Sequence, residues 1–113
     1  MSTDCLFCKI VAGEVPSTTV LETERAYAFR DIAPHTPTHV LVVPREHHAD
    51  VASLVRADPA LLAEVFEAAV QVAEQEGLTG GYRLLANTGP DSGQTVFHAH
   101  VHVLGGRPMG VLA

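Results

Sequence analysis

The sequence is short of basic residues and has no long apolar run. Only 7 Lys and Arg stand against 13 Asp and Glu, which gives a formal net charge of -6. A field of this sign repels polyanions, so nucleic acid is excluded as the expected partner, whereas a small phosphate ligand can still be held at close range by backbone N–H groups. Because neither a basic leader followed by an apolar segment nor about 18 consecutive apolar residues occurs, we expect a cytoplasmic protein that does not enter a membrane.

Charged residues of both signs make up only 18% of the chain, whereas 47% of it is hydrophobic. That balance excludes intrinsic disorder, and 113 residues suffice for one compact domain. We therefore expect a single domain over residues 1–113, with apolar surface that a second copy of the chain could cover.

Hydrophobic periodicity and turn residues predict the order of the structural elements. A short amphipathic helix follows Asp4, its expected cap, and ends at Gly13. One long helix begins at Asp58-Pro59 and carries an apolar stripe up to Gly77. Strands are predicted over residues 18–21, 26–30, 39–43, 82–86 and 96–104. This order is typical of an α+β domain with a mainly antiparallel five-stranded sheet.

Only two cysteines occur, Cys5 and Cys8, and they form a C-x-x-C pair. In a chain for which no export is expected, such a pair indicates metal binding or redox chemistry more than a structural disulfide. Two cysteines cannot complete a four-coordinate zinc site, so a metal would need two further ligands, for which the 7 histidines are the obvious source. A thioredoxin-like redox pair is the alternative interpretation.

Three of the histidines, His98, His100 and His102, alternate with apolar residues. On one extended strand they would share a face at intervals of about 6.6 Å, while the intervening apolar residues, Phe97 among them, would face the core. Nucleophilic catalysis needs an imidazole nitrogen that is left unprotonated, and the middle histidine, flanked by two others, is the natural candidate. A His-x-His metal site is the competing interpretation.

A glycine-containing loop, residues 89–94, directly precedes these histidines, and Thr95 follows it. The backbone N–H groups of such a loop can cradle a phosphate, and the Thr95 hydroxyl would add a further donor. A loop of this kind alone is usually only a turn. Its position within a few residues of the histidines favours phosphoryl or nucleotidyl chemistry.

Together these residues resemble the histidine triad family of nucleotide hydrolases and transferases, in particular its Hint-like branch. The motif that carries the resemblance is GQTVFHAHVHVLGG, residues 93–106. Further matching segments are LFCKI at 6–10, FRDI at 29–32, THVLVVP at 38–44 and NTG at 87–89, so the resemblance extends over nearly the whole chain.

The resemblance implies a homodimer in which the sheets of two subunits join, and a site that binds a purine nucleoside monophosphate. It implies that His100 attacks the α-phosphorus to form a nucleotidyl-histidine intermediate that water hydrolyses, while His39 and His102 flank the phosphate. The positions that match the loop holding the phosphate and the nucleophile are Asn87, Gly93, Gln94 and Thr95. Those that match the ribose carboxylate and the base pocket are, respectively, Asp31 and the five apolar residues Leu6, Phe7, Ile10, Phe29 and Ile32.

A zinc site is also implied by the resemblance. Bacterial-type relatives that keep the cysteine pair complete it with two histidines, which here are His47 and His98. Zinc on His98 would anchor the histidine strand without occupying His100. Spacing alone does not separate His47 from its neighbour His48 as the ligand.

The expected function is therefore hydrolysis of nucleoside 5'-monophosphate derivatives, such as phosphoramidates. A dinucleoside polyphosphate hydrolase or nucleotidyl transferase would share the chemistry but not the substrate. A non-catalytic nucleotide-binding regulatory module would share the binding alone. The complete histidine row and Thr95 favour an enzyme, because a protein that only binds gains nothing from an unprotonated nucleophile.

Overall fold

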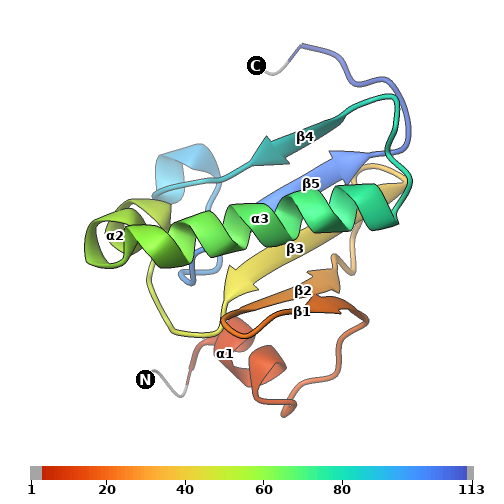
Figure 1. Cartoon of the computed structure of the whole chain (residues 1–113). Coiled ribbons are helices and arrows are strands. Elements are labelled where there is room, and N and C mark those ends of the chain that lie inside the picture. Colours follow the sequence, from red (N-terminus) through yellow and green to blue (C-terminus); the bar gives the residue numbers. More distant parts are fainter. Residues whose placement is uncertain (1–3, 112–113) are drawn as a thin grey trace.

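Five strands form one open sheet in the order β1-β2-β3-β5-β4, and every neighbouring pair is antiparallel (Figure 1). The computed structural model describes residues 4–111. The strands are β1 (Thr19–Glu22), β2 (Ala26–Arg30), β3 (Thr38–Pro44), β4 (Tyr82–Leu85) and β5 (Val101–Gly105). The predicted α+β architecture with a mainly antiparallel five-stranded sheet is confirmed.

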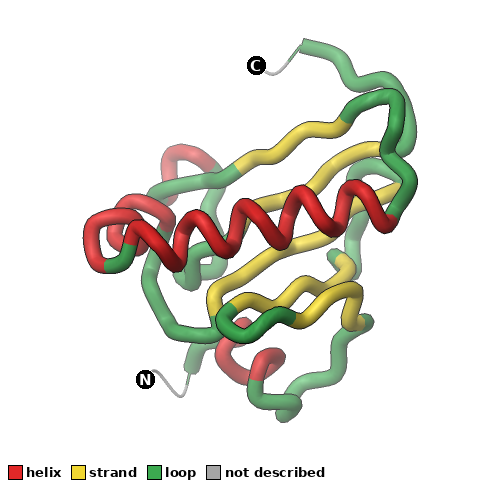
Figure 2. The backbone as a smooth tube through the Cα atoms, in the orientation of Figure 1, coloured by secondary structure: helices red, strands yellow, loops and turns green. Residues whose placement is uncertain are grey.

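One long helix, α3 (Pro59–Gln75), crosses a face of the sheet, and Figure 2 shows it as one uninterrupted helix over the strands. Its start follows the predicted signals, because the Asp58 side chain accepts a hydrogen bond from the Leu61 N–H and Pro59 takes the first turn, where no N–H is needed. The short helix α1 (Leu6–Val11) packs on the other side of the sheet. The molecule thus has a helix on each face.

Strand β3 separates two hydrophobic clusters because its side chains alternate between the faces of the sheet. Val40 and Val42 belong to the core beneath α3. Leu41 and Val43 belong to a second core that includes residues of α1. All seven residues of β3 are buried, as expected for a central strand that reads as a continuous apolar run. His39, a predicted site residue, shares the face of Leu41, so it is on the α1 side of the sheet.

Two expectations about helices are wrong. A further helix, α2 (Val51–Ala57), precedes α3, and among its residues only Leu54 is buried, so no apolar stripe revealed it. Its signal was the capping box that Asp50 forms with Ser53. At the N-terminus, the residue that caps α1 is Cys5, whose Sγ accepts the Cys8 N–H at 3.3 Å, rather than Asp4.

The last strand is shorter than predicted, since β5 begins at Val101 and not near residue 96. Its partner β3 ends at Pro44, a residue without a backbone N–H to donate, and the last β3–β5 pair is Val42 with Val101. Upstream of β5 the chain leaves the ladder, and the Ala99 N–H bonds the His48 carbonyl at 2.7 Å. Among residues 4–111, no helix combines the length and the apolar character that crossing a membrane requires.

Candidate active site and metal centre

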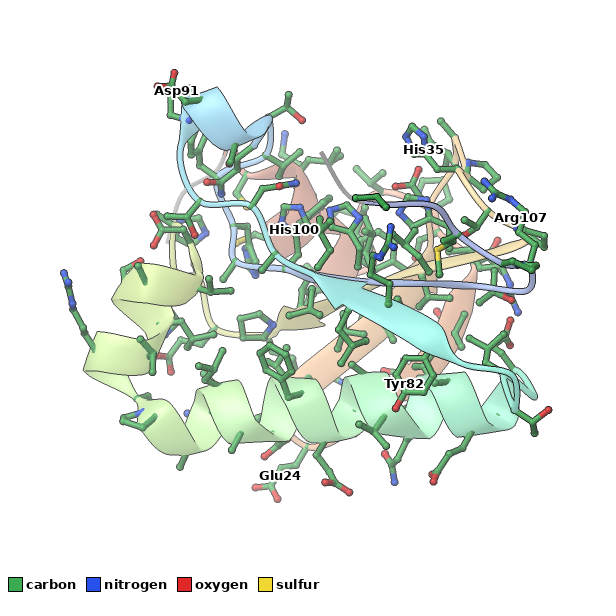
Figure 3. All side chains as sticks on the ribbon, turned by 90° about the horizontal axis from the view of Figure 1, so that it is seen from above. Glu24, His35, Tyr82, Asp91, His100 and Arg107 are labelled. Carbon is green, nitrogen blue, oxygen red and sulfur yellow. The ribbon has the colours of Figure 1, made fainter. Side chains whose placement is uncertain are left out.

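The three alternating histidines do not form the single row that the sequence predicts. Only His102 lies on β5, while His98 and His100 precede it in irregular chain. His98 is fully buried and faces the two cysteines, whereas His100 and His102 line a cavity on the α1 side. Figure 3 shows His100 on the side of the sheet away from α3. Phe97, expected in the core, is 50% exposed. The backbone irregularity before β5 therefore divides the histidines between two sites.

The His100 ring has a fixed orientation and one free nitrogen. Its Nδ1 lies 2.8 Å from the His98 carbonyl oxygen, and because a carbonyl only accepts, Nδ1 carries the proton. The lone pair is then on Nε2. Burial lowers the pKa of His100, which keeps the ring neutral, and the Phe7 ring meets it edge-on with 5.1 Å between centroids. This is the state that a nucleophilic imidazole requires.

A cavity of about 220 Å³ opens beside His100 and His102. Six of its lining residues are those that the sequence assigned to a base pocket and a ribose carboxylate, namely Leu6, Phe7, Ile10, Phe29, Asp31 and Ile32. The others, besides the two histidines and Thr95, are Pro16, Ser17, Arg30, Leu41 and Val96, which the sequence reasoning missed. Leu41 could have been found, because it lies two residues after His39 on the same strand face.

His39 and His102 meet at the inner side of this site. The His39 Nε2 lies 2.9 Å from the His102 Nδ1 and 3.5 Å from the Asp31 Oδ2. Burial is the main cause that lowers the pKa of His39, and it lowers the pKa of His102 to about 4. The other oxygen of Asp31, Oδ1, accepts the Ala33 N–H at 2.8 Å, which holds the carboxylate in a local turn.

The predicted phosphate loop folds around a short 3-10 helix, η1 (Pro90–Ser92), and two glycines with positive φ, Gly89 and Gly93. The Gln94 side chain is buried inside this loop. Its amide nitrogen donates to the Ala49 and Val96 carbonyls at 2.9 and 3.1 Å, and its oxygen accepts the Gly89 N–H at 2.8 Å. Gln94 therefore braces the loop from within, whereas Thr95 is exposed on the cavity and Asn87 is half-buried.

Four donors of the types that zinc prefers converge around the buried His98 ring. The Sγ atoms of Cys5 and Cys8 and the Nδ1 atoms of His47 and His98 all lie within 4.8 Å of one another. The two Nδ1 atoms are 3.2 Å apart. The His98 Nδ1 lies 3.3 Å from the Cys5 Sγ and 3.5 Å from the Cys8 Sγ, and the His47 Nδ1 lies 3.4 Å from the Cys8 Sγ. Four ligands around one tetrahedral zinc would give separations of about 3.3 Å between nitrogens and about 3.6 Å between sulfur and nitrogen. The cluster therefore fits that metal.

The hydrogen bonds and burial around these four residues suit a metal as well. His98 Nε2 donates to the Pro44 carbonyl at 2.8 Å, which leaves Nδ1 unprotonated and directed at the sulfurs. Burial lowers the pKa of His98 to about 4, so the ring is neutral. Burial, with the neighbouring Cys5, raises the pKa of Cys8 to about 11, so a bound cation is what would favour the thiolate form of Cys8.

The structure also distinguishes His47 from His48. His48 Nε2 lies 2.7 Å from the Glu46 Oε1, and the ring belongs to this surface pair rather than to the cysteine cluster. Sequence spacing could not have decided this, because the choice depends on the direction that the chain takes after Pro44.

Comparison with known proteins agrees with this geometry. A model of the HIT domain family matches residues 12–109. The chain is 40% identical over 111 residues to a purine nucleoside phosphoramidase of Escherichia coli, covering 97% of this chain and 93% of the relative. It is 45% identical over 107 residues to a 14 kDa zinc-binding protein of Zea mays, covering 92% and 83%. The solved structure of a HIT family hydrolase from Clostridium thermocellum superposes with a TM-score of 0.94 at 45% identity, over 99% of this chain and 98% of that one.

Proposed function

The chain belongs to the HIT domain family, and from this premise we propose that it hydrolyses purine nucleoside 5'-phosphoramidates and related nucleotide derivatives at the α-phosphorus. The observation that carries the proposal is the hydrogen bond from His100 Nδ1 to the His98 carbonyl. It leaves the Nε2 lone pair of a neutral imidazole beside a cavity that apolar side chains line together with a few polar ones, among them the Asp31 carboxylate.

In the proposed reaction, His100 Nε2 attacks the α-phosphorus and forms a phosphorus–nitrogen bond. The bond from phosphorus to the leaving amine breaks, and the amine departs after taking a proton from solvent. The nucleotidyl-His100 intermediate is then hydrolysed by water, which yields the nucleoside monophosphate and restores the free imidazole. Covalent catalysis of this kind replaces one difficult substitution with two easier ones.

The rest of the site suits a purine nucleotide. The apolar side chains of Leu6, Phe7, Ile10, Phe29 and Ile32 would enclose the base, and Asp31 would accept hydrogen bonds from the ribose hydroxyls. His39 and His102 would flank the phosphate. Thr95 and the backbone around Asn87, Gly93 and Gln94 would supply further donors, with the Gln94 side chain holding that backbone in place.

We also propose that the cysteine–histidine cluster holds a structural zinc ion. Cys5, Cys8, His47 and His98 would be its ligands, and the ion would supply the positive charge that makes the buried thiolates favourable. The residue that links the two sites is His98, whose ring belongs to the cluster and whose carbonyl fixes His100. Metal analysis should find about one zinc per chain, and a variant with Cys5→Ser and Cys8→Ser should contain none; a parent protein free of zinc would refute this assignment.

A homodimer joined through the sheet completes the proposal. Strand β4 is an edge of the sheet, and Phe66 on α3 and Tyr82 on β4 are each 38% exposed, which leaves large apolar side chains for a second copy to cover. Light scattering coupled to gel filtration should give twice the mass of the chain. A Tyr82→Arg variant should elute as a monomer, and a monomeric parent would refute the proposal.

Turnover of adenosine 5'-phosphoramidate tests the function. We expect the parent to release AMP, and His100→Ala to lose more than about a thousandfold in kcat while it still binds AMP. Glu24→Gln, an exposed carboxylate far from His100 (Figure 3), serves as the control and should turn over normally. If His100→Ala retained the parent's turnover, His100 would not be the nucleophile. AMP binding with no turnover by the parent would instead favour a regulatory module.

A further inference from the structure

The proton positions on His39 follow from one backbone contact. The His35 N–H donates to the His39 Nδ1 at 3.1 Å. A nitrogen that accepts a hydrogen bond carries no proton, and a neutral imidazole has one proton to place. His39 is therefore protonated on Nε2. The Asp31 Oδ2, 3.5 Å from that nitrogen, favours the same tautomer because a negative oxygen attracts the N–H.

The tautomer of His102 follows from that of His39. The protonated Nε2 of His39 lies 2.9 Å from the His102 Nδ1, so this Nδ1 is an acceptor and the single proton of His102 is on Nε2. Among the side-chain atoms of residues 4–111, the His102 Nε2 is buried and has no hydrogen-bond partner within the chain. A buried donor without an acceptor costs about 1–3 kcal/mol, and a ligand oxygen removes that cost.

The same contacts exclude a doubly protonated ring in this pair. A second proton on His39 would sit on Nδ1 and oppose the His35 N–H, and a second proton on His102 would oppose the His39 Nε2–H. The titratable groups that surround the pair are His35, His100 and Asp31, and burial lowers the pKa of both members. Asp31 is the only one of the three that favours protonation.

We propose that the His35 amide and the Asp31 carboxylate lock His39 and His102 as neutral imidazoles protonated on Nε2, so that His102 is a fixed neutral donor to an α-phosphate oxygen. Asp31 is then a positioning residue for the chemistry, in addition to its proposed contact with ribose. The identity of the ligand rests on the proposed function, whereas the two tautomers do not. A neutral donor stabilises charge that develops on the phosphate oxygens without giving up its proton.

A carboxylate and an amide at position 31 should have different effects on the His39 tautomer. A carboxylate only accepts, so it supports one tautomer of His39. An asparagine at this position could donate its N–H to the His39 Nε2, which would favour the opposite tautomer and set the Nδ1 proton against the His35 amide. Asp31→Asn should therefore disorder the pair even though the side chain keeps its size.

The tautomers are measured directly by NMR on the full-length, zinc-supplemented protein labelled with ¹⁵N-histidine. Two-bond ¹H–¹⁵N correlations should show His39 and His102 each protonated on Nε2 alone at pH 7. In Asp31→Asn both should shift toward mixed tautomers, whereas His35→Ala, which keeps the backbone amide, and the distant Glu24→Gln should match the parent. His39 protonated on Nδ1, or a doubly protonated His102 at pH 7, would overturn the proposal.

Kinetics then separate positioning from ribose binding. With a 2',3'-dideoxyadenosine phosphoramidate, which offers no ribose hydroxyls, Asp31→Asn should still lower kcat by about tenfold or more. If the loss caused by Asp31→Asn disappeared with this substrate, Asp31 would act through ribose alone and the positioning role would be refuted. If the parent turned over neither substrate, the proposed function would fail, while the NMR spectra would still decide the tautomers.

Discussion

The two buried histidines His98 and His100 are only two residues apart, yet they present opposite nitrogens to their surroundings. His98 donates from Nε2 to the Pro44 carbonyl and presents Nδ1 to the cysteines. His100 donates from Nδ1 to the His98 carbonyl and presents Nε2 to the cavity. Both rings are neutral because burial lowers their pKa. The backbone acceptor that each ring bonds therefore decides which nitrogen is left unprotonated. That nitrogen, rather than the residue type, decides whether the histidine suits a metal or a phosphorus atom.

Replacing His98 and His100 in turn should separate the two sites. The largest effect that we predict is the loss of activity in His100→Ala. His100→Ala is expected to lose more than about a thousandfold in kcat but less stability than His98→Ala, because its buried ring borders a cavity and is not a proposed metal ligand. His98→Ala should instead lose on the order of 3 kcal/mol in the free energy of unfolding, since a fully buried ring and a proposed metal ligand are removed. Activity assays and calorimetry on both variants measure this. Equal losses of stability in the two variants would contradict the division.

Removing the metal should first lower stability, through the cluster that includes His98. If zinc occupies the cluster, a chelator should lower the stability of the parent by several kcal/mol, about 4 kcal/mol where free zinc had been a thousandfold above Kd. We expect kcat to fall only indirectly, when loss of the metal displaces the His98 carbonyl that orients His100. Calorimetry with and without chelator, with Cys8→Ser as the variant that should no longer respond, tests this. A parent whose melting temperature ignores the chelator would argue against a structural ion.

Acid should weaken the fold through the buried neutral rings. The folded protein holds the pKa of His102 at about 4 against an ordinary value of 6.5. Between these values the unfolded chain binds the proton and the folded chain does not, so the free energy of unfolding falls as pH decreases from 6.5 toward 4. Each such histidine contributes a slope of about 1.4 kcal/mol per pH unit in that window, and none above it. Urea titrations at pH 7, 5.5 and 4.5 should show a smaller decline in His102→Gln; an equal decline in both proteins would remove His102 from this account.

The phosphate loop should depend on Gln94 for its shape. The buried amide of this residue bonds three backbone groups, from Ala49, Gly89 and Val96, and Gln94→Ala leaves them unpaired. We expect a loss of about 1–3 kcal/mol in the free energy of unfolding and weaker AMP binding. Denaturant unfolding and calorimetric titration measure the two effects, with Asp91→Asn on the exposed side of the loop as the control. Unchanged AMP affinity in Gln94→Ala would show that the loop does not hold the phosphate.

The smallest effect is expected next to the pair formed by His39 and His102. Arg107 donates to the His35 carbonyl at 3.2 Å and so steadies the loop whose amide donates to His39. The contact is exposed, so Arg107→Ala should lower kcat only about twofold, without a change in zinc content. A loss of a hundredfold would mean that Arg107 contacts the substrate itself.

Patterns within one segment were predicted well from the sequence. The caps and apolar stripe of α3, the continuous apolar run of β3 and the C-x-x-C pair each depend on neighbouring residues, and the structure has them where expected. The helix α2 escaped notice because almost all of its side chains are exposed. Contacts between separate segments could not be predicted from the sequence. Examples are the hydrogen bond from His98 to the Pro44 carbonyl and the one from the His35 amide to His39. These contacts depend on where β3 ends and where the chain turns.

The proposed nucleophile is the Nε2 of His100, which the hydrogen bond from Nδ1 to the His98 carbonyl leaves unprotonated. The most direct measurement is acid quenching of the parent during turnover of an adenosine phosphoramidate, followed by mass spectrometry of the digested protein. We predict an adenylyl group on the peptide that contains residues 98–102, assigned by fragmentation to His100. Adenylylation of His98 or His102, or full turnover without any protein adduct, would contradict the account.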